Sequence, residues 1–220
     1  MSRKKLIVLL IILLLVVGGL LSFYYITNKD ALKFKKDFES YNNKSLKYDN
    51  KSGKYLNVKI DFKNPIIYLT DENISKELKE DSKMILFGKS NDNNTRAIIS
   101  TLFKAAKDNS VEEIYYYDLD NLEKRYEKND KNAVKIYEEI TKLLDSNLTD
   151  TFTDGPNKGK KKINTPTVIV VNKEKVVSFY SGTVETHKDY FKNLTENEQN
   201  ELYKTYENVV LDLIMCTDDC

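Results

Sequence analysis

The sequence predicts an α/β protein in which a central mixed sheet, made of a βαβ unit and an antiparallel β-hairpin, is flanked by helices and follows an N-terminal transmembrane helix. Three observations predict this organisation: an uncharged run at 6–26, an apolar strand–helix–strand succession at 84–117, and two apolar strands within 168–180. The strand–helix–strand succession is typical of parallel strands. The short polar turn between the last two strands indicates an antiparallel pair.

The N-terminal run is long enough to cross a bilayer, because 21 residues of helix span about 30 Å. Arg3, Lys4 and Lys5 precede it, which favours a cytoplasmic N-terminus. The alternative is a cleaved secretory signal, but its apolar core usually covers about 7–15 residues and ends at a small-x-small site, which this run lacks. We predict a cytoplasmic tail at 1–5, a single-pass cell-membrane anchor at 6–26 and an extracytoplasmic remainder.

The composition argues against a nucleic-acid partner. The chain has 35 Lys and Arg against 34 Asp and Glu, and without the three basic residues before the anchor the balance is 32 to 34. Nucleic-acid binding requires a clustered basic face, and the longest basic block is the short one at 158–162. The length after the anchor suits one domain. We assign a juxtamembrane helix and lead-in strand to 27–63 and the main domain to 64–220.

Local patterns place the remaining elements. Helical spacing of apolar residues predicts helices, and alternation or short apolar runs predict strands. The predicted helices lie at 30–42, 70–79, 95–107, 121–142 with a break near Asn129, and from Thr195, where Glu198 completes a capping box. The predicted strands lie at 55–62, 65–69, 84–87, 113–118, 168–171 and 176–180, with polar connections at 42–53 and 146–162.

Two cysteines, Cys216 and Cys220, lie at the C-terminus. In an oxidising compartment, a pair four residues apart predicts a structural disulfide. The single histidine, His187, lies in a polar connection and is expected on the surface. His187 and the two cysteines lack a fourth ligand and the usual spacing of a zinc site, so we expect neither a metal nor a cofactor.

Two segments together carry a resemblance to a known family. The first, 83–96, reads KMILFGKSNDNNTR, a buried strand that runs into a helix start, and the second, 164–171, reads NTPTVIVV. With the order βαβ, α, β, β, α, they resemble the thioredoxin-like fold over about residues 64–215. More narrowly, the chain looks like the extracytoplasmic thioredoxin-like proteins of Gram-positive bacteria, of the bacteriocin-transport-accessory type.

The resemblance implies positions for a dithiol site. In that family the strand ending Phe-Gly is followed by Cys-x-x-Cys, and counting from Phe87 these cysteines fall on Asp92 and Thr95. Pro166, after Thr165, falls on the family's cis-proline, and Gly182 falls on the glycine after the last strand. A helix N-terminus stabilises negative charge, which activates a thiolate in such a site. Here the same position holds a carboxylate, which also caps the helix.

We therefore predict a binding or accessory module that is redox-inactive at the usual site. Its partner is expected to be an exported peptide or a membrane protein, bound by strand addition beside Thr165 and Pro166 and by polar groups of Asp92, Asn93 and Asn94. The simpler interpretation of Asp92 is that it only caps the helix. The alternative function is a thiol-disulfide oxidoreductase that uses Cys216 and Cys220 or assists a partner's dithiol.

Overall fold

The computed structural model describes residues 12–19 and 24–219, with side chains as far as Cys216. The predicted tail at 1–5, half of the predicted anchor and Cys220 lie outside these residues. In the described part of the chain no single helix meets the length and apolarity that a membrane span needs. One bent pair, Ile12–Thr27 with Lys29–Glu39, meets those criteria jointly. The anchor therefore stays a prediction.

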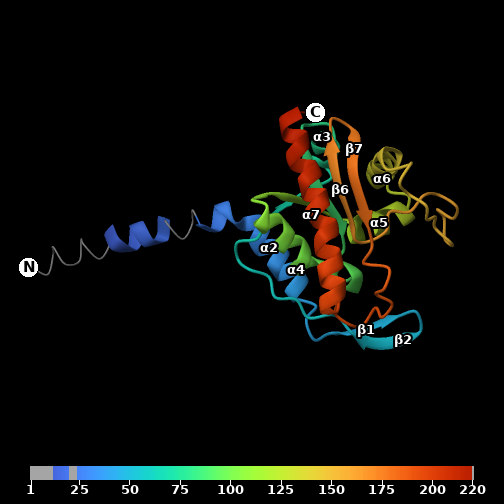
Figure 1. Cartoon of the computed structure of the whole chain (residues 1–220), viewed down its shortest axis with the longest axis horizontal. Helices are drawn as coiled ribbons and strands as arrows, with labels where there is room; N and C mark the ends of the chain where they lie inside the picture. Colours follow the sequence, from blue (N-terminus) through green and yellow to red (C-terminus); the bar gives the residue numbers. More distant parts are fainter. Residues whose placement is uncertain (1–11, 20–23, 220) are drawn as a thin grey trace, which may run out of the picture.

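A five-stranded mixed sheet lies at the centre of the protein (Figure 1). Its strands are β3 (Ile66–Tyr68), β4 (Lys83–Gly88), β5 (Ile114–Asp118), β6 (Thr167–Asn172) and β7 (Lys175–Ser181). They lie in the order β3-β5-β4-β6-β7. The first three are mutually parallel, whereas β6 is antiparallel to both of its neighbours. The predicted βαβ unit and antiparallel hairpin are both present.

Helices cover both faces of the sheet, so its central strands are buried on both sides. The helices are α2 (Lys29–Glu39), α3 (Ile74–Glu77), α4 (Asn93–Asp108), α5 (Leu119–Glu127), α6 (Lys131–Leu143) and α7 (Glu196–Asp219). α2, α4 and α7 share one apolar core with the sheet, and α3, α5 and α6 share the other. The predicted break near Asn129 separates α5 from α6, and Asn129 has a φ of 55°.

The predicted capping box at the last helix is present. Glu198 accepts hydrogen bonds from the Thr195 N–H at 2.7 Å and from its hydroxyl at 2.8 Å, and the Thr195 hydroxyl in turn accepts from the Glu198 N–H. This reciprocal pair satisfies donors that a helix start leaves without partners. The local sequence signal therefore determined where α7 begins.

The predicted strand at 55–62 is absent, although the alternation that suggested it is real. Leu56 and Ile60 are buried, as expected for one face of a strand. The segment pairs with side chains instead of a neighbouring strand. Its N–H groups at 56, 58 and 60 donate to the side chains of Asn93, Asn42 and Glu39. Alternation of apolar residues indicates that one face of a segment is buried. It does not indicate which groups form hydrogen bonds with the backbone of that segment.

A two-stranded hairpin, β1 (Ser45–Tyr48) with β2 (Lys51–Lys54), occupies the region predicted to be a polar connection. Asp49 and Asn50 form its turn with φ values of 47° and 59°. Positive φ at both central residues is the geometry of the two-residue hairpin turn, and Asp and Asn tolerate it. The strands are polar on both faces, so their hydrophobic pattern gave no signal.

Arg96 joins the N-terminal segments to the sheet. Its side chain is buried, and none of the hydrogen bonds that it makes within the described residues goes to a carboxylate. The guanidinium donates to the carbonyls of Leu56 and Phe38 at 2.7 Å, to that of Ser90 at 2.9 Å and to the Asn42 side-chain oxygen at 2.7 Å. Burial lowers its pKa to about 10, so it is charged at neutral pH. Residues 29–63 thus pack as part of the same body as the sheet.

We predict that Arg96→Ala costs at least about 3 kcal/mol of unfolding free energy, because three carbonyls and an amide oxygen lose their donor inside the protein. Arg125 is the matched control, since its guanidinium pairs with Asp71 at 2.6 Å while remaining partly exposed. Arg125→Ala should cost about 1 kcal/mol or less. Urea unfolding followed by circular dichroism measures both. Equal losses would contradict the role given to Arg96.

Candidate functional site

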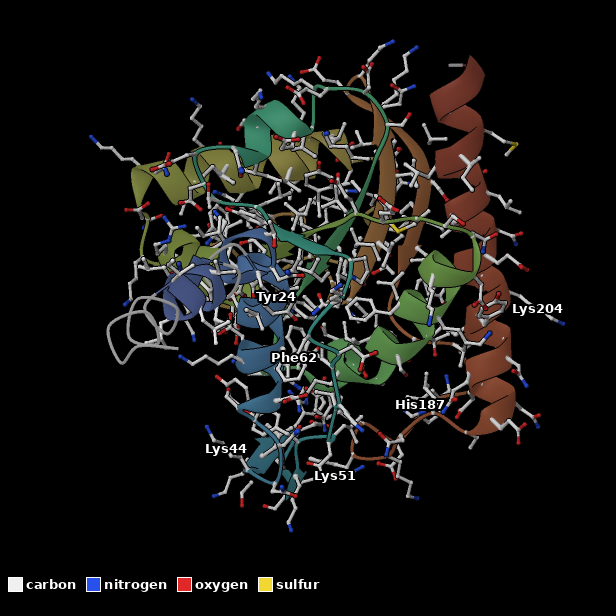
Figure 2. All side chains as sticks on the ribbon, turned by 90° about the vertical axis from the view of Figure 1, so that its left-hand side faces the viewer. Tyr24, Lys44, Lys51, Phe62, His187 and Lys204 are labelled. Atoms are coloured by element: carbon white, nitrogen blue, oxygen red, sulfur yellow. The ribbon has the colours of Figure 1, made fainter. Side chains whose placement is uncertain are left out.

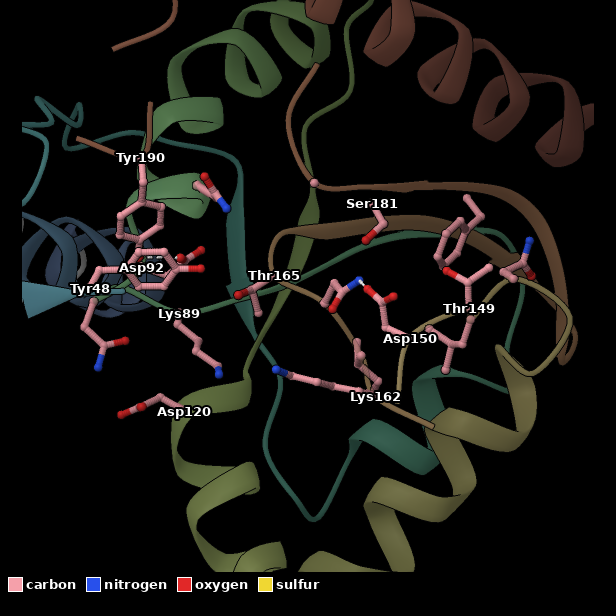
Figure 3. A pocket seen from close by; sticks show the side chains of 18 residues that line it. Tyr48, Lys89, Asp92, Asp120, Thr149, Asp150, Lys162, Thr165, Ser181 and Tyr190 are labelled. Carbon is pink, nitrogen blue, oxygen red and sulfur yellow. Dashed lines mark hydrogen bonds between the residues drawn. The ribbon is translucent and has the colours of Figure 1, made fainter. Parts of the chain in front are cut away.

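A groove of about 700 Å³ opens where the start of α4, the segment before β6 and the end of β7 meet (Figure 3). Asp92 lines it from α4, Thr165 from the segment before β6, and Ser181 from β7. The two segments that the sequence singled out therefore lie at the same groove. Clefts of this size at the ends of sheet strands are common ligand sites.

Asp92 caps α4, as predicted. One carboxylate oxygen accepts from the Thr95 N–H at 2.8 Å and from the Thr95 hydroxyl at 2.7 Å. The other accepts from the Tyr190 hydroxyl at 2.9 Å. The negative charge thus lies at the positive end of the helix dipole with three donors around it.

Tyr190 covers the helix start from a loop about one hundred residues further along the chain. Its hydroxyl accepts from the Asn93 N–H at 3.0 Å while it donates to Asp92. Burial, and next the charge of Asp92, raise the pKa of Tyr190, so its hydroxyl keeps the proton that it donates. The ring stacks on Tyr48 of β1 with centroids 3.8 Å apart. The hairpin and this loop together form one wall of the groove.

Thr95 and Asn93 lie beneath the groove. Both are fully buried. Gly88 leaves room for Thr95, because a Cβ on Gly88 would lie 2.8 Å from the Thr95 methyl carbon. The Asn93 side chain accepts from the Leu56 N–H and donates to the carbonyls of Lys54 and Tyr190. Three polar residues at the helix start were predicted to bind a peptide. Asp92 and Asn94 line the groove, whereas the Asn93 side chain is hydrogen-bonded to the backbone of the groove wall.

The Thr165–Pro166 peptide bond is cis, as the resemblance implies. Pro166 is buried, and its carbonyl accepts from the Gly182 N–H at 2.7 Å, while Gly182 has a φ of 86°. Thr165 is half-buried and lines the groove. Within residues 24–219, no hydrogen bond engages its N–H or its carbonyl. Thr165 therefore offers the groove a free backbone donor and acceptor.

Charged side chains that the sequence did not single out complete the site. Lys89 forms an ion pair with Glu123, which is largely buried. Burial raises the pKa of Glu123, and the charge of Lys89 opposes that rise. Lys162 and Asp150 line the groove opposite α4, and Asp150 accepts a hydrogen bond from the Asn164 amide. Lys89 lies three residues before Asp92, so its place beside the site could have been predicted from the sequence. No local pattern indicates that Tyr190 belongs to the site.

Cys216 lies far from this groove. It is buried near the end of α7, a helix of 24 residues that extends about 36 Å. The Asn93–Tyr190 contacts place the groove near β2 and the loop before α7, and the C-terminal end of α7 lies at the end of the molecule away from β1 and β2 (Figure 1). The predicted disulfide to Cys220 lies outside the described residues.

The expectation of a surface histidine was wrong. The His187 side chain is only 6% exposed, and its Nδ1 lies 3.5 Å from the Glu198 carboxylate. In the residues that the structure describes, no three His, Cys, Asp or Glu side chains are grouped so as to hold a metal ion.

Comparisons with known proteins add no family to this geometry: no family model matches the chain, and no curated protein matches it.

We predict that Asp92→Ala destabilises the fold by more than the about 1 kcal/mol that loss of a helix cap typically costs, because Tyr190 also loses its acceptor. Asp130→Ala is the matched control, since Asp130 caps α6 through the Ala133 N–H at 2.9 Å and otherwise pairs with the Arg125 guanidinium at a longer 3.6 Å. Thermal or urea unfolding compares the two variants. If both cost the same, the Tyr190 contact adds nothing to stability.

Proposed function

We propose that this chain is a membrane-anchored, extracytoplasmic, thioredoxin-like module that binds extended peptides of exported or membrane proteins and does not exchange dithiols at Asp92 and Thr95. The free backbone groups of Thr165 carry the proposal. An extended peptide can pair with them as an additional strand, with main-chain hydrogen bonds providing affinity and the groove selecting side chains.

The thioredoxin-like part of the proposal is supported by the arrangement of the sheet. The order of elements from β4 to α7 is the one on which the resemblance rests. The helix after β4 begins beside the segment that precedes β6. Asp92, matched to the first cysteine, and Thr165, which precedes the matched proline, therefore line one groove. The membrane part is supported by the uncharged run at 6–26.

The chemistry of the helix start supports binding over exchange. A thiolate at position 92 would be the nucleophile of a dithiol site, whereas the carboxylate there is held by Thr95 and Tyr190. Thiol exchange also needs direct attack of one sulfur on another. Cys216 lies near the C-terminal end of α7, and that end is far from the groove. Peptide binding needs neither sulfur.

We predict that peptides selected from a random phage-displayed library on the full chain in nanodiscs bind through Thr165. Thr165→Pro removes the N–H and should weaken binding about tenfold, the effect of one lost hydrogen bond of about 1.4 kcal/mol. Thr165→Ala keeps the N–H and should bind almost as well as the unchanged chain. Fluorescence anisotropy of labelled peptides measures both.

The interpretation fails in either of two cases. In the first, no peptide is enriched by the selection. In the second, Thr165→Pro retains its melting temperature and binds like Thr165→Ala, which would show that the backbone of Thr165 is not used.

We further predict that the unchanged protein reduces insulin no faster than the background thiol does. The double variant Asp92→Cys, Thr95→Cys should gain reductase activity, because the two side chains already touch at 2.7 Å and the helix start activates a thiolate. If instead the unchanged protein is active and Cys216→Ser abolishes the activity, the tail cysteines are the site. A folded but inactive double variant would show that the matched positions are misplaced.

A further inference from the structure

The described domain begins almost where the predicted anchor ends. The uncharged run ends at Ile26, residues 24–27 are helical, and α2 begins at Lys29. The first turn of α2 is fixed to the domain, because Asp30 accepts from the Tyr68 N–H at 3.1 Å and the Ala31 carbonyl accepts from the Asn64 amide at 2.9 Å. Only two residues separate the run from α2, so a domain anchored by this run would have no stalk and would lie against the bilayer.

Aromatic residues mark the end of the run. Tyr24 is 39% exposed and Tyr25 is 65% exposed. Tyr and Trp are enriched at membrane–water interfaces, where an apolar ring and a polar group are both accommodated. With the predicted anchor in a bilayer, these two tyrosines would lie at the membrane–water interface, at the start of the domain.

Phe62 is an exposed aromatic residue beside α2. It occupies a bend in the chain and is 60% exposed. Lys35 of α2 donates to the Ile60 carbonyl at 2.7 Å and lies 5.1 Å from the Phe62 ring. Lys35 is six residues along α2 from Lys29, about 9 Å of helix. Figure 2 views the protein from the side on which the N-terminal segment leaves and labels Tyr24 and Phe62.

Lysines flank this ring. Lys59 and Lys63 are exposed on either side of Phe62 in the chain, with Asp61 between them, so residues 59–63 carry a net charge of one positive unit. Both lysines line a groove with Lys104 and Lys107 of α4. Three acidic residues line the same groove: Asp61, Asp108 and Glu112. Long basic side chains can lie along an apolar surface while their ammonium groups reach lipid headgroups.

We propose that the face around Phe62 docks on the outer leaflet of the bilayer, with the Phe62 ring inserted at headgroup depth and Lys59 and Lys63 on anionic headgroups. The proposal rests on the proposed anchor and is independent of peptide binding. Docking would hold the domain in one orientation and fix which way the groove at Asp92 opens relative to the membrane.

The absence of tryptophan from the sequence permits a direct test. Phe62→Trp in the full chain, reconstituted into nanodiscs that contain bromine-labelled lipid, places a single reporter at the proposed contact. Val177→Trp on β7 is the control, because Val177 is 39% exposed and lies on the sheet strand farthest from β3. Flotation and circular dichroism first show that each variant is inserted and folded.

The expected result is quenching of the Phe62→Trp fluorescence well above that of Val177→Trp, and stronger in phosphatidylglycerol discs than in phosphatidylcholine discs. Reversing Lys59 and Lys63 to Glu should lower the docked fraction in phosphatidylglycerol by at least about fivefold, since one lysine at an anionic surface contributes about 1 kcal/mol. Equal quenching of the two reporters overturns docking. Failure to float overturns the anchor and docking together, while peptide selection tests the groove separately.

Discussion

A single buried cation organises the N-terminal third of this protein. Arg96 is surrounded by four oxygens that belong to α2, to the segment after α2, to the extended segment at 55–62 and to the loop before α4. None of these oxygens is a carboxylate, so neutral dipoles surround the charge, and the Tyr55 ring lies 5.9 Å from the guanidinium carbon. Burial lowers the pKa of Arg96. Because a buried charge without partners is very costly, each of these segments is constrained to its position.

The groove depends on the same arrangement. The Arg96 and Asn93 side chains both bind the backbone at Leu56, which holds the end of β2 beside the start of α4. Asn93 also binds the Tyr190 carbonyl, and the Tyr190 ring stacks on Tyr48. A wall made of β1, β2 and the loop before α7 is thus assembled on side chains of α4. Changes at Arg96 should therefore reach the groove as well as the global stability.

Much of the fold was predictable because its signals are local. Apolar runs at β4 and β6, the helical spacing after Asp92 and the Thr195–Glu198 box each act within a few residues, and each element formed where its pattern indicated. Two of the errors share one cause. At 55–62 the backbone is satisfied by distant side chains, and Tyr190 reaches Asp92 across 98 positions of sequence. No local pattern encodes such pairings, so the sequence predicted one side of the groove and missed the wall opposite.

The charge at position 92 shows what the helix start does here. A thiolate at that position would need to stay accessible, because its role is to attack a second sulfur. Asp92 instead uses both oxygens on internal donors, and Tyr190 closes one side of it. Position 92, which the resemblance matches to a reactive cysteine, is thus a fixed support. Across the groove, the backbone N–H and carbonyl of Thr165 have no hydrogen-bond partner within residues 24–219. The proposed recognition by the backbone of Thr165, beside a rigid Asp92 corner, rests on that division.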